Sequence, residues 1–262
     1  MRILTRRPNL RISEAEKMPF EDRESYFWTG RSALEIIKLV QRTTGRSTFY
    51  KILDMASGHG RVLRWLKFAY PKAKLTVCEV QESALEFCEK AFGAKPLVPS
   101  DLKSEKDQDS YDLIWVGSLF THLDIKMWDE TLSLLYSKLD ENGVLIFTTH
   151  GDLVATRLGS IDNYGLDSES TKKLISEYSD SGFGYQRYPN DLTTNESSGN
   201  YGVSVSSTQF VLGYMRKFQD MQLIFLGEMK WANHQDVYAF IRKEIDTKFP
   251  EVMVNWMSEV SQ

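Results

Sequence analysis

Short apolar runs alternate with amphipathic segments over the first 150 residues, and this alternation predicts the fold. We expect strands where apolar residues form uninterrupted runs and helices where they recur every three or four positions. The expected strands are 52–53, 75–78, 95–98, 113–116 and 144–149, and the expected helices are 62–68, 83–92 and 125–139. Strands that alternate with helices form a mainly parallel sheet covered on both faces, so we predict an α/β fold with a doubly wound sheet.

Local signals place some of the helix ends. Ser32 and Glu35 have the spacing of a capping box, which predicts a first helix from Ser32 to a stop at Gly45. Ser83 and Glu86 repeat the pattern and predict the start of a later helix.

The character of the chain changes after Gly151. Residues 160–207 are rich in Ser, Thr, Asn, Asp, Gly and Tyr, and we interpret them as a lid insertion outside the core. A helix near 210–218 and strands at 223–226 and 237–241 follow. We therefore expect one domain in three parts: an N-terminal arm and helix (1–45), a ligand-binding core (46–150), and a lid with a closing helix and hairpin (151–262).

Composition and charge exclude several classes of protein. The net charge is −4 and no block of basic residues occurs, so we expect no nucleic-acid partner. The apolar runs are far shorter than the roughly 20 residues of a membrane helix, so we expect no membrane span. Two cysteines, no secretion signal and no convergent His or Cys spacing predict a reduced cytoplasmic protein without a metal site. The oligomeric state is not predicted.

The strongest chemical signal is the segment 51–63, in which a strand leads into a glycine-containing turn and then a helix. Gly58 and Gly60 allow a ligand to approach the backbone, and the helix start favours an electronegative ligand group. About 20 residues later Glu79 ends the second strand, where a carboxylate can accept hydrogen bonds from ribose hydroxyls. The spacing predicts a nucleotide-like ligand. We expect His59, within the turn, to point outward.

Two residues favour S-adenosylmethionine over a dinucleotide. Leu63 stands where the dinucleotide fingerprint has its third glycine. Asp54 places a negative charge where pyrophosphate would be repelled and where the ammonium and sulfonium of S-adenosylmethionine would be attracted.

With these features the sequence resembles the class I, Rossmann-like S-adenosylmethionine-dependent methyltransferases, in particular the small-molecule group with type 11, 12 or 25 domains. The similar segments are 52–60, Glu79, 100–102, 111–123 and 139–147. The resemblance implies that Asp54, Ala56, Gly58 and Gly60 line the methionine end, Glu79 the ribose, Asp101 and Leu102 the adenine, and Ser118 the edge facing the substrate. Segments 201–207 and 227–238 further resemble a subset associated with glycan assembly, which implies an antiparallel hairpin closing the sheet.

Candidates for acceptor chemistry lie outside the glycine turn. His122, His150 and His234 are candidate general bases, because an oxygen or nitrogen acceptor loses a proton as it gains the methyl. A buried structural histidine is the alternative for each of them. Tyr26, Trp28, Arg31 and Trp231 are candidate substrate contacts, and Tyr185, Tyr188 and Tyr201 are lid positions that could shape the acceptor pocket.

We therefore predict a methyltransferase acting on an oxygen, less readily a nitrogen, of a small molecule or glycan by in-line displacement. A base is not obligatory, since alignment in a dry pocket can supply much of the rate. The alternatives are a non-catalytic scaffold with the same fold, an NAD-dependent oxidoreductase, and an RNA or protein methyltransferase.

Overall fold

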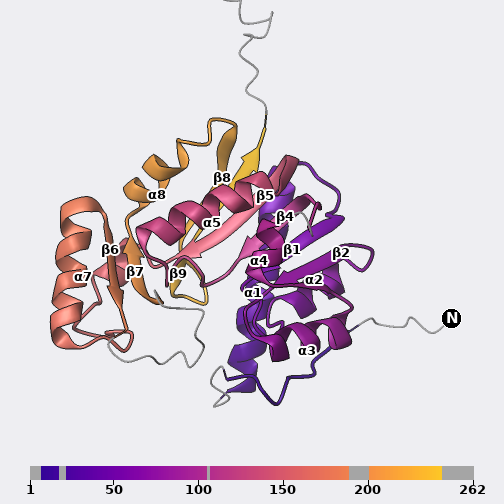
Figure 1. The fold of residues 1–262 in the computed structure, drawn as a ribbon, viewed down its shortest axis with the longest axis horizontal. Coiled ribbons are helices and arrows are strands. Elements are labelled where there is room, and N and C mark those ends of the chain that lie inside the picture. The colour runs from indigo at the N-terminus through magenta and orange to yellow at the C-terminus, as the bar shows by residue number, and fades with distance from the viewer. Residues whose placement is uncertain (1–6, 18–21, 105–106, 189–200, 244–262) are drawn as a thin grey trace, which may run out of the picture.

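A computed structural model describes residues 7–17, 22–104, 107–188 and 201–243. Its main sheet has seven strands in the order β3-β2-β1-β4-β5-β9-β8 (Figure 1). The first five of these in that order are parallel. β9 runs antiparallel to β5, and β8 pairs antiparallel with β9, so β8 again runs in the direction of the first five strands. Their bounds are β1 Lys51–Met55, β2 Lys74–Cys78, β3 Lys95–Leu97, β4 Tyr111–Val116, β5 Leu139–Thr149, β8 Met221–Trp231 and β9 Gln235–Arg242. The predicted α/β sheet with a closing antiparallel hairpin is confirmed.

Helices cover both faces of this sheet because its strands are apolar on both sides. One core cluster joins the sheet to α1 (Arg23–Thr43), α2 (Leu63–Ala69) and α3 (Glu82–Phe92). The other joins it to α4 (Pro99–Lys103), α5 (Ile125–Ser137) and α8 (Thr208–Met215). The strand order reverses between β1 and β4. In open α/β sheets the carboxyl ends of the strands at such a reversal form the ligand crevice.

Residues 152–188 and 201–206 form an ordered unit that includes the described part of the predicted lid insertion. It contains α6 (Asp152–Ala155), α7 (Ser168–Ser181) and a two-stranded sheet of β6 (Phe183–Arg187) and β7 (Gly202–Ser206). Leu174, Val203 and Val205 are fully buried in a core cluster of this unit. Serines alternate with these valines, so the sequence of β7 has the composition of a polar loop. Residues 189–200 of the predicted lid lie outside the described residues.

Backbone hydrogen bonds attach β7 to the main sheet. The N–H groups of Gly202, Ser204 and Ser206 donate to the carbonyl oxygens of His122, Thr121 and His150, at 3.1, 2.9 and 2.9 Å. β7 therefore runs along the segments that leave the carboxyl ends of β4 and β5.

Two predicted helix starts are wrong. The first helix begins at Arg23, where the Asp22 side chain accepts from the Glu24 N–H, and Ser32 lies inside it and donates to the Thr29 carbonyl. Helix α3 begins at Glu82, directly before the predicted capping box at Ser83. The spacing of a capping box can occur at several places in a helix, and the sequence pattern alone does not show at which residue the helix begins.

Arg64 joins the N-terminal segment to the glycine turn. Its guanidinium, 1% exposed, donates to the carbonyl oxygens of Arg11 (2.6 Å), Asn9 (3.2 Å), Gly60 (2.9 Å) and His59 (3.3 Å). It also donates to the Tyr26 hydroxyl at 3.2 Å. Burial lowers the pKa of Arg64, while Tyr26 and Glu16 favour its charged form. A single buried cation thus connects residues 9–11, α1 and the turn after β1.

We predict that Arg64→Met lowers the free energy of unfolding by about 3 kcal/mol, because several carbonyl oxygens lose their hydrogen-bond donor and Glu16 loses a nearby positive charge. Urea unfolding followed by circular dichroism measures this change. Lys90→Met is the matched control, since it removes an exposed ion pair with Glu86 and should leave stability unchanged. Equal stability of the two variants would contradict this role for Arg64.

Candidate functional site

The turn after β1 has the backbone of a ligand-binding turn. Ala56, Gly58 and Gly60 have φ angles of 55°, 50° and 75°. A Cβ on Gly60 would lie 2.7 Å from the Phe92 ring, so only glycine fits there. Ala56 adopts the same left-handed region with a side chain, which few residues do without a local reason. The N–H groups of these three residues donate within the protein, to the Cys78 carbonyl, the Glu79 carboxylate and the Ser57 carbonyl.

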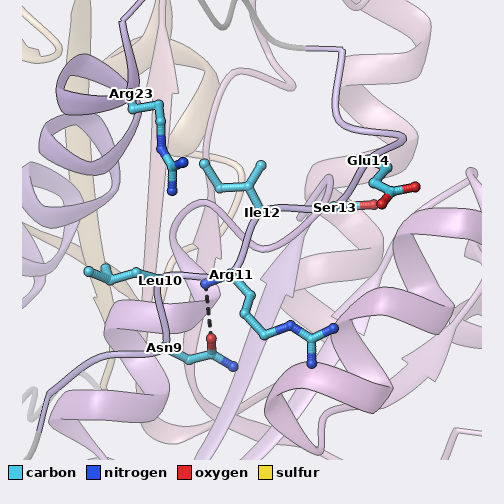
Figure 2. A pocket seen from close by; sticks show the side chains of 7 residues that line it. All are labelled: Asn9, Leu10, Arg11, Ile12, Ser13, Glu14 and Arg23. Atoms are coloured by element: carbon cyan, nitrogen blue, oxygen red, sulfur yellow. Dashed lines mark hydrogen bonds between the residues drawn. The ribbon is translucent and has the colours of Figure 1, made fainter.

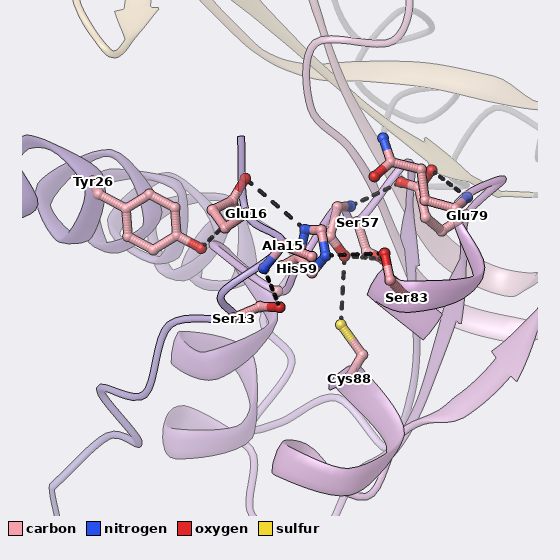
Figure 3. A network of polar contacts seen from close by, with 12 residues as sticks. Ser13, Ala15, Glu16, Tyr26, Ser57, His59, Glu79, Ser83 and Cys88 are labelled. Atoms are coloured by element: carbon pink, nitrogen blue, oxygen red, sulfur yellow. Dashed lines mark hydrogen bonds and ion pairs between the residues drawn. The ribbon is translucent and has the colours of Figure 1, made fainter. Parts of the chain in front are cut away.

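Glu79 lies beside this turn, as its position at the end of β2 predicts. Its carboxylate accepts from the N–H groups of Gly58 (2.9 Å), Val80 (2.7 Å) and Gln81 (3.2 Å). Figure 3 shows the carboxylate next to the turn. Because a carboxylate has about four acceptor positions, these bonds fix its orientation and leave it able to accept from a ligand hydroxyl.

Asp54 is the most unusual group of the site. The side chain is 2% exposed at the end of β1, and its Oδ2 has no hydrogen-bond partner among the described residues. Burial and the nearby Glu79 raise the pKa of Asp54 to about 8, against the opposing effect of Arg61. A buried carboxylate without a partner is costly unless a cation pairs with it. The ammonium group of an amino acid moiety fits this requirement.

His59 is buried, so the prediction that it points outward is wrong. It is 3% exposed, its Nδ1 lies 3.9 Å from Glu16 Oε1, and its Nε2 lies 3.5 Å from the Ser83 hydroxyl. Glu16 also accepts from the Tyr26 hydroxyl at 2.9 Å. Figure 3 shows this group of side chains next to the turn. The N-terminal segment covers His59, which local sequence does not reveal.

The remaining predicted cofactor residues lie on two elements. Asp101 and Leu102 belong to the short helix α4, the first half-buried and the second fully buried. Ser118 follows β4 with a φ of 58°. Its N–H donates to the Thr148 hydroxyl at 2.9 Å, and its hydroxyl accepts from the Gln235 amide at 2.8 Å. Gln235 was not predicted, because a single polar residue at a strand start gives no signal in the sequence.

The three candidate bases lie together. Ring centroids are 6.4 Å apart for His122 and His150 and 5.2 Å apart for His150 and His234. Burial lowers the pKa of all three, that of His150 to about 3. Tyr164, which the sequence did not single out, packs on His150 at 4.6 Å. The carboxyl ends of β4 and β5 and the β8–β9 turn thus bring neutral imidazoles to one place.

The predicted substrate contacts are dispersed. Tyr26 is buried in the Glu16 and Arg64 contacts described above, and Trp231 is buried against Trp115 and donates to the Thr29 carbonyl. Trp28 is 47% exposed, and Arg31 forms an exposed ion pair with Glu35. Their roles toward a substrate stay predictions.

A surface cavity of about 570 Å³ lies along the N-terminal segment. It is lined by residues 9–14 and Arg23, as Figure 2 shows. None of the predicted cofactor or acceptor residues lines it, so it is separate from the candidate site.

Two further searches concern only the described part of the chain. There, no helix is both long and apolar enough to cross a bilayer. Within the same ranges, no three His, Cys, Asp or Glu side chains converge on a point where a metal ion could bind. Cys78 and Cys88 are both free and buried.

Comparison with known proteins agrees with this geometry. Residues 53–145 match the family model described as a methyltransferase domain. The malonyl-[acyl-carrier protein] O-methyltransferase of Anoxybacillus flavithermus is 29% identical over 117 residues, which is 44% of each chain. That of Halalkalibacterium halodurans is 30% identical over 135 residues, 44% of this chain and 49% of the relative. The chain therefore matches less than half the length of these relatives.

Solved structures show the same fold. The plantazolicin methyltransferase BpumL, in complex with a monoazolic desmethylPZN analogue and S-adenosylhomocysteine (SAH), aligns with a TM-score of 0.55 at 17% identity. The alignment covers 85% of this chain and 86% of BpumL. An S-adenosylmethionine-dependent methyltransferase from Clostridium acetobutylicum aligns with a TM-score of 0.53 at 15% identity, covering 85% and 93% of the two chains. Residues 53–145 therefore match the methyltransferase domain, within a chain that has the class I S-adenosylmethionine-dependent methyltransferase fold.

Proposed function

We propose that this protein transfers a methyl group from S-adenosylmethionine to an oxygen of a small molecule or glycan. The observation that carries the proposal is the unpartnered, buried carboxylate of Asp54 beside the glycine turn and Glu79. The site has two carboxyl groups, Asp54 before the turn and Glu79 after β2, which suit an ammonium and a ribose and disfavour a pyrophosphate.

Each residue of the site has a proposed task toward the cofactor. Asp54 pairs with the ammonium of the methionine part, and the positive-φ turn at Ala56, Gly58 and Gly60 borders it. Glu79 accepts from the ribose hydroxyls, and Leu102 contributes an apolar surface beside the adenine. When bound, the cofactor supplies a methyl group on a positively charged sulfur. Ser118, held by Thr148 and Gln235, borders the side where the acceptor enters.

The acceptor side is formed by the carboxyl ends of β4 and β5 together with β7. Three neutral histidines lie there, and a neutral imidazole can accept a proton from a hydroxyl. The curated relatives are named as O-methyltransferases, which supports oxygen as the acceptor atom. Their malonyl-carrier substrate is not proposed for this chain, because the match spans less than half of them.

We predict that ligand binding displaces a proton from Asp54. With a pKa near 8 the carboxyl is mostly protonated at pH 7. A cation beside it lowers the pKa, so the bound state is ionised and a proton leaves. Between pH 5 and 7 the SAH dissociation constant should fall roughly tenfold per pH unit. Titration calorimetry in buffers of different ionisation enthalpy measures the released proton.

Asp54→Asn should remove this pH dependence and weaken SAH binding, whereas exposed Asp180→Asn on α7 should behave as wild type. A binding enthalpy that is independent of the buffer in the unaltered protein would contradict the proposed ion pair.

We predict that Glu79→Gln weakens SAH binding about 10- to 100-fold, because charged hydrogen bonds to hydroxyls contribute roughly 1.5–3 kcal/mol. Fluorescence titration with SAH measures the affinity. Glu82→Gln, three residues along on the exposed start of α3, is the control and should bind like wild type. If both variants retain full affinity, Glu79 does not hold the ribose.

A further inference from the structure

Six aromatic rings meet beside the carboxyl ends of β4 and β5, and we name them the ring cluster: His122, His150, His234, Tyr164, Tyr188 and Tyr201. His122 stacks on Tyr201 with centroids 4.5 Å apart and planes inclined by 23°. Its other ring neighbours are Tyr188 and His150, each at 6.4 Å. The rings come from six separate positions in the chain, so the fold assembles them.

Hydrogen bonds to β7 determine where the proton lies on two of these imidazoles. His122 Nδ1 is 2.8 Å from the Gly202 carbonyl oxygen, and His150 Nδ1 is 3.2 Å from that of Ser204. A carbonyl can only accept, so each Nδ1 carries a hydrogen. Burial lowers the pKa of both rings and keeps them neutral. Each Nε2 therefore has a free lone pair, the form of histidine that can take a proton.

His122 is held more firmly than His150, by two consecutive residues. Tyr201 covers one ring face, and Gly202 binds the ring nitrogen and also donates its N–H to the His122 carbonyl at 3.1 Å. A Cβ on Gly202 would lie 2.3 Å from the Gln186 carbonyl oxygen, so a larger residue would displace this strand. The dipeptide 201–202 leaves His122 one free nitrogen.

The ring cluster adjoins the cofactor side of the site. Ser118 and His122 are on the same segment after β4, and the Glu79 carboxylate acts electrostatically on Tyr201. The rings that contact His122 are a second imidazole and two phenols, whose pKa values burial raises, so they are uncharged at neutral pH. Arg157 and Asp162 act on His234 instead.

On the basis of the proposed methyl transfer, we propose that His122 is the general base, that Tyr201 is its positioning residue, and that the acceptor is an uncharged hydroxyl compound. His122 Nε2 takes the hydroxyl proton while the acceptor oxygen bonds to the methyl carbon and the electron pair of the broken carbon–sulfur bond stays on sulfur. A carboxylate, ionised at pH 7, has no proton to give. A neutral histidine that is positioned to accept a proton would have no role toward a carboxylate acceptor. We therefore infer that the acceptor of this chain differs from that of its malonyl-carrier relatives.

Two experiments test this inference on the full-length protein. Long-range ¹H–¹⁵N NMR of the histidine rings determines which ring nitrogen carries the hydrogen, and it needs no methyl acceptor. We expect His122 and His150 as neutral Nδ1–H tautomers at pH 7, and loss of that fixed state for His122 in Tyr201→Leu but not in Tyr201→Phe. SAH formation is then measured with catechol, glucose, butanol, butyrate and butylamine as acceptors, and the pH dependence of kcat is recorded.

Hydroxyl acceptors should be methylated, and His122→Asn should lower kcat about 100-fold or more with a small change in KM. Asn can still donate to the Gly202 carbonyl, so this variant should fold and bind SAH. Tyr201→Leu should lower kcat about tenfold, Tyr201→Phe should recover most of it, and Tyr136→Phe on distant α5 should match wild type.

Several results would overturn the inference. These are an Nε2–H or charged His122 at pH 7, methylation of butyrate or butylamine in preference to the hydroxyl compounds, or full kcat in His122→Asn. Failure of the unaltered protein to bind SAH would instead refute the proposed function. If SAH binds but no acceptor reacts, the NMR result alone decides whether His122 has the form of a base.

Discussion

The candidate site depends on one unfavourable burial, that of the Asp54 carboxylate at the end of the central strand β1. A 2% exposed carboxylate with an unpartnered oxygen destabilises the folded protein unless it is protonated or meets a cation. The surrounding architecture keeps it in place. The positive-φ turn follows it directly, and Glu79 lies on the adjacent strand, where its negative charge raises the pKa of Asp54 further. A cationic ligand would pair with this carboxylate and favour its ionised form.

The elements that hold this site come from distant parts of the chain. Arg64 fixes the two carbonyls of the turn and attaches residues 9–11 to it, so the N-terminal segment becomes part of the cofactor side. On the opposite side β7 fixes His122 and His150 through backbone carbonyls. The carboxyl edge of the sheet thus carries the candidate site. Residues 9–11 contact the turn through Arg64 on one side, and β7 orients the two imidazoles on the other.

Local sequence predicts what depends on local geometry. Asp54, Gly58, Gly60 and Glu79 could be identified because a turn between a strand and a helix needs those residue types at that spacing. Histidines at the ends of two neighbouring parallel strands could also be expected to come near each other. Apolar runs predicted strands at 223–226 and 237–241, and the closing hairpin that they form was implied by the resemblance of segments 201–207 and 227–238 to a subset of methyltransferases.

Other features could not be predicted, because their partners are far apart in sequence. Arg64 appears as an ordinary exposed helix residue until residues 9–11 and Tyr26 are placed around it. Gly202 and Tyr201 stand 80 and 79 residues after His122 in a polar stretch, and only strand pairing brings them to that ring. Strand pairing between β6 and β7 likewise gives the region of the predicted lid a core of its own, which its polar composition does not reveal. The two helix starts were placed at the wrong residues because residues suited to capping occur at more than one position near the start of each helix.

The central claim is that the turn after β1 holds an adenosyl ligand with a cationic amino acid end rather than a dinucleotide. Titration calorimetry of the purified protein with S-adenosylmethionine, SAH, adenosine and NAD tests it most directly. The account predicts micromolar binding of the first two ligands, much weaker binding of adenosine because it lacks the ammonium that Asp54 requires, and no binding of NAD. Binding of NAD, or equal affinity for adenosine and SAH, would contradict it.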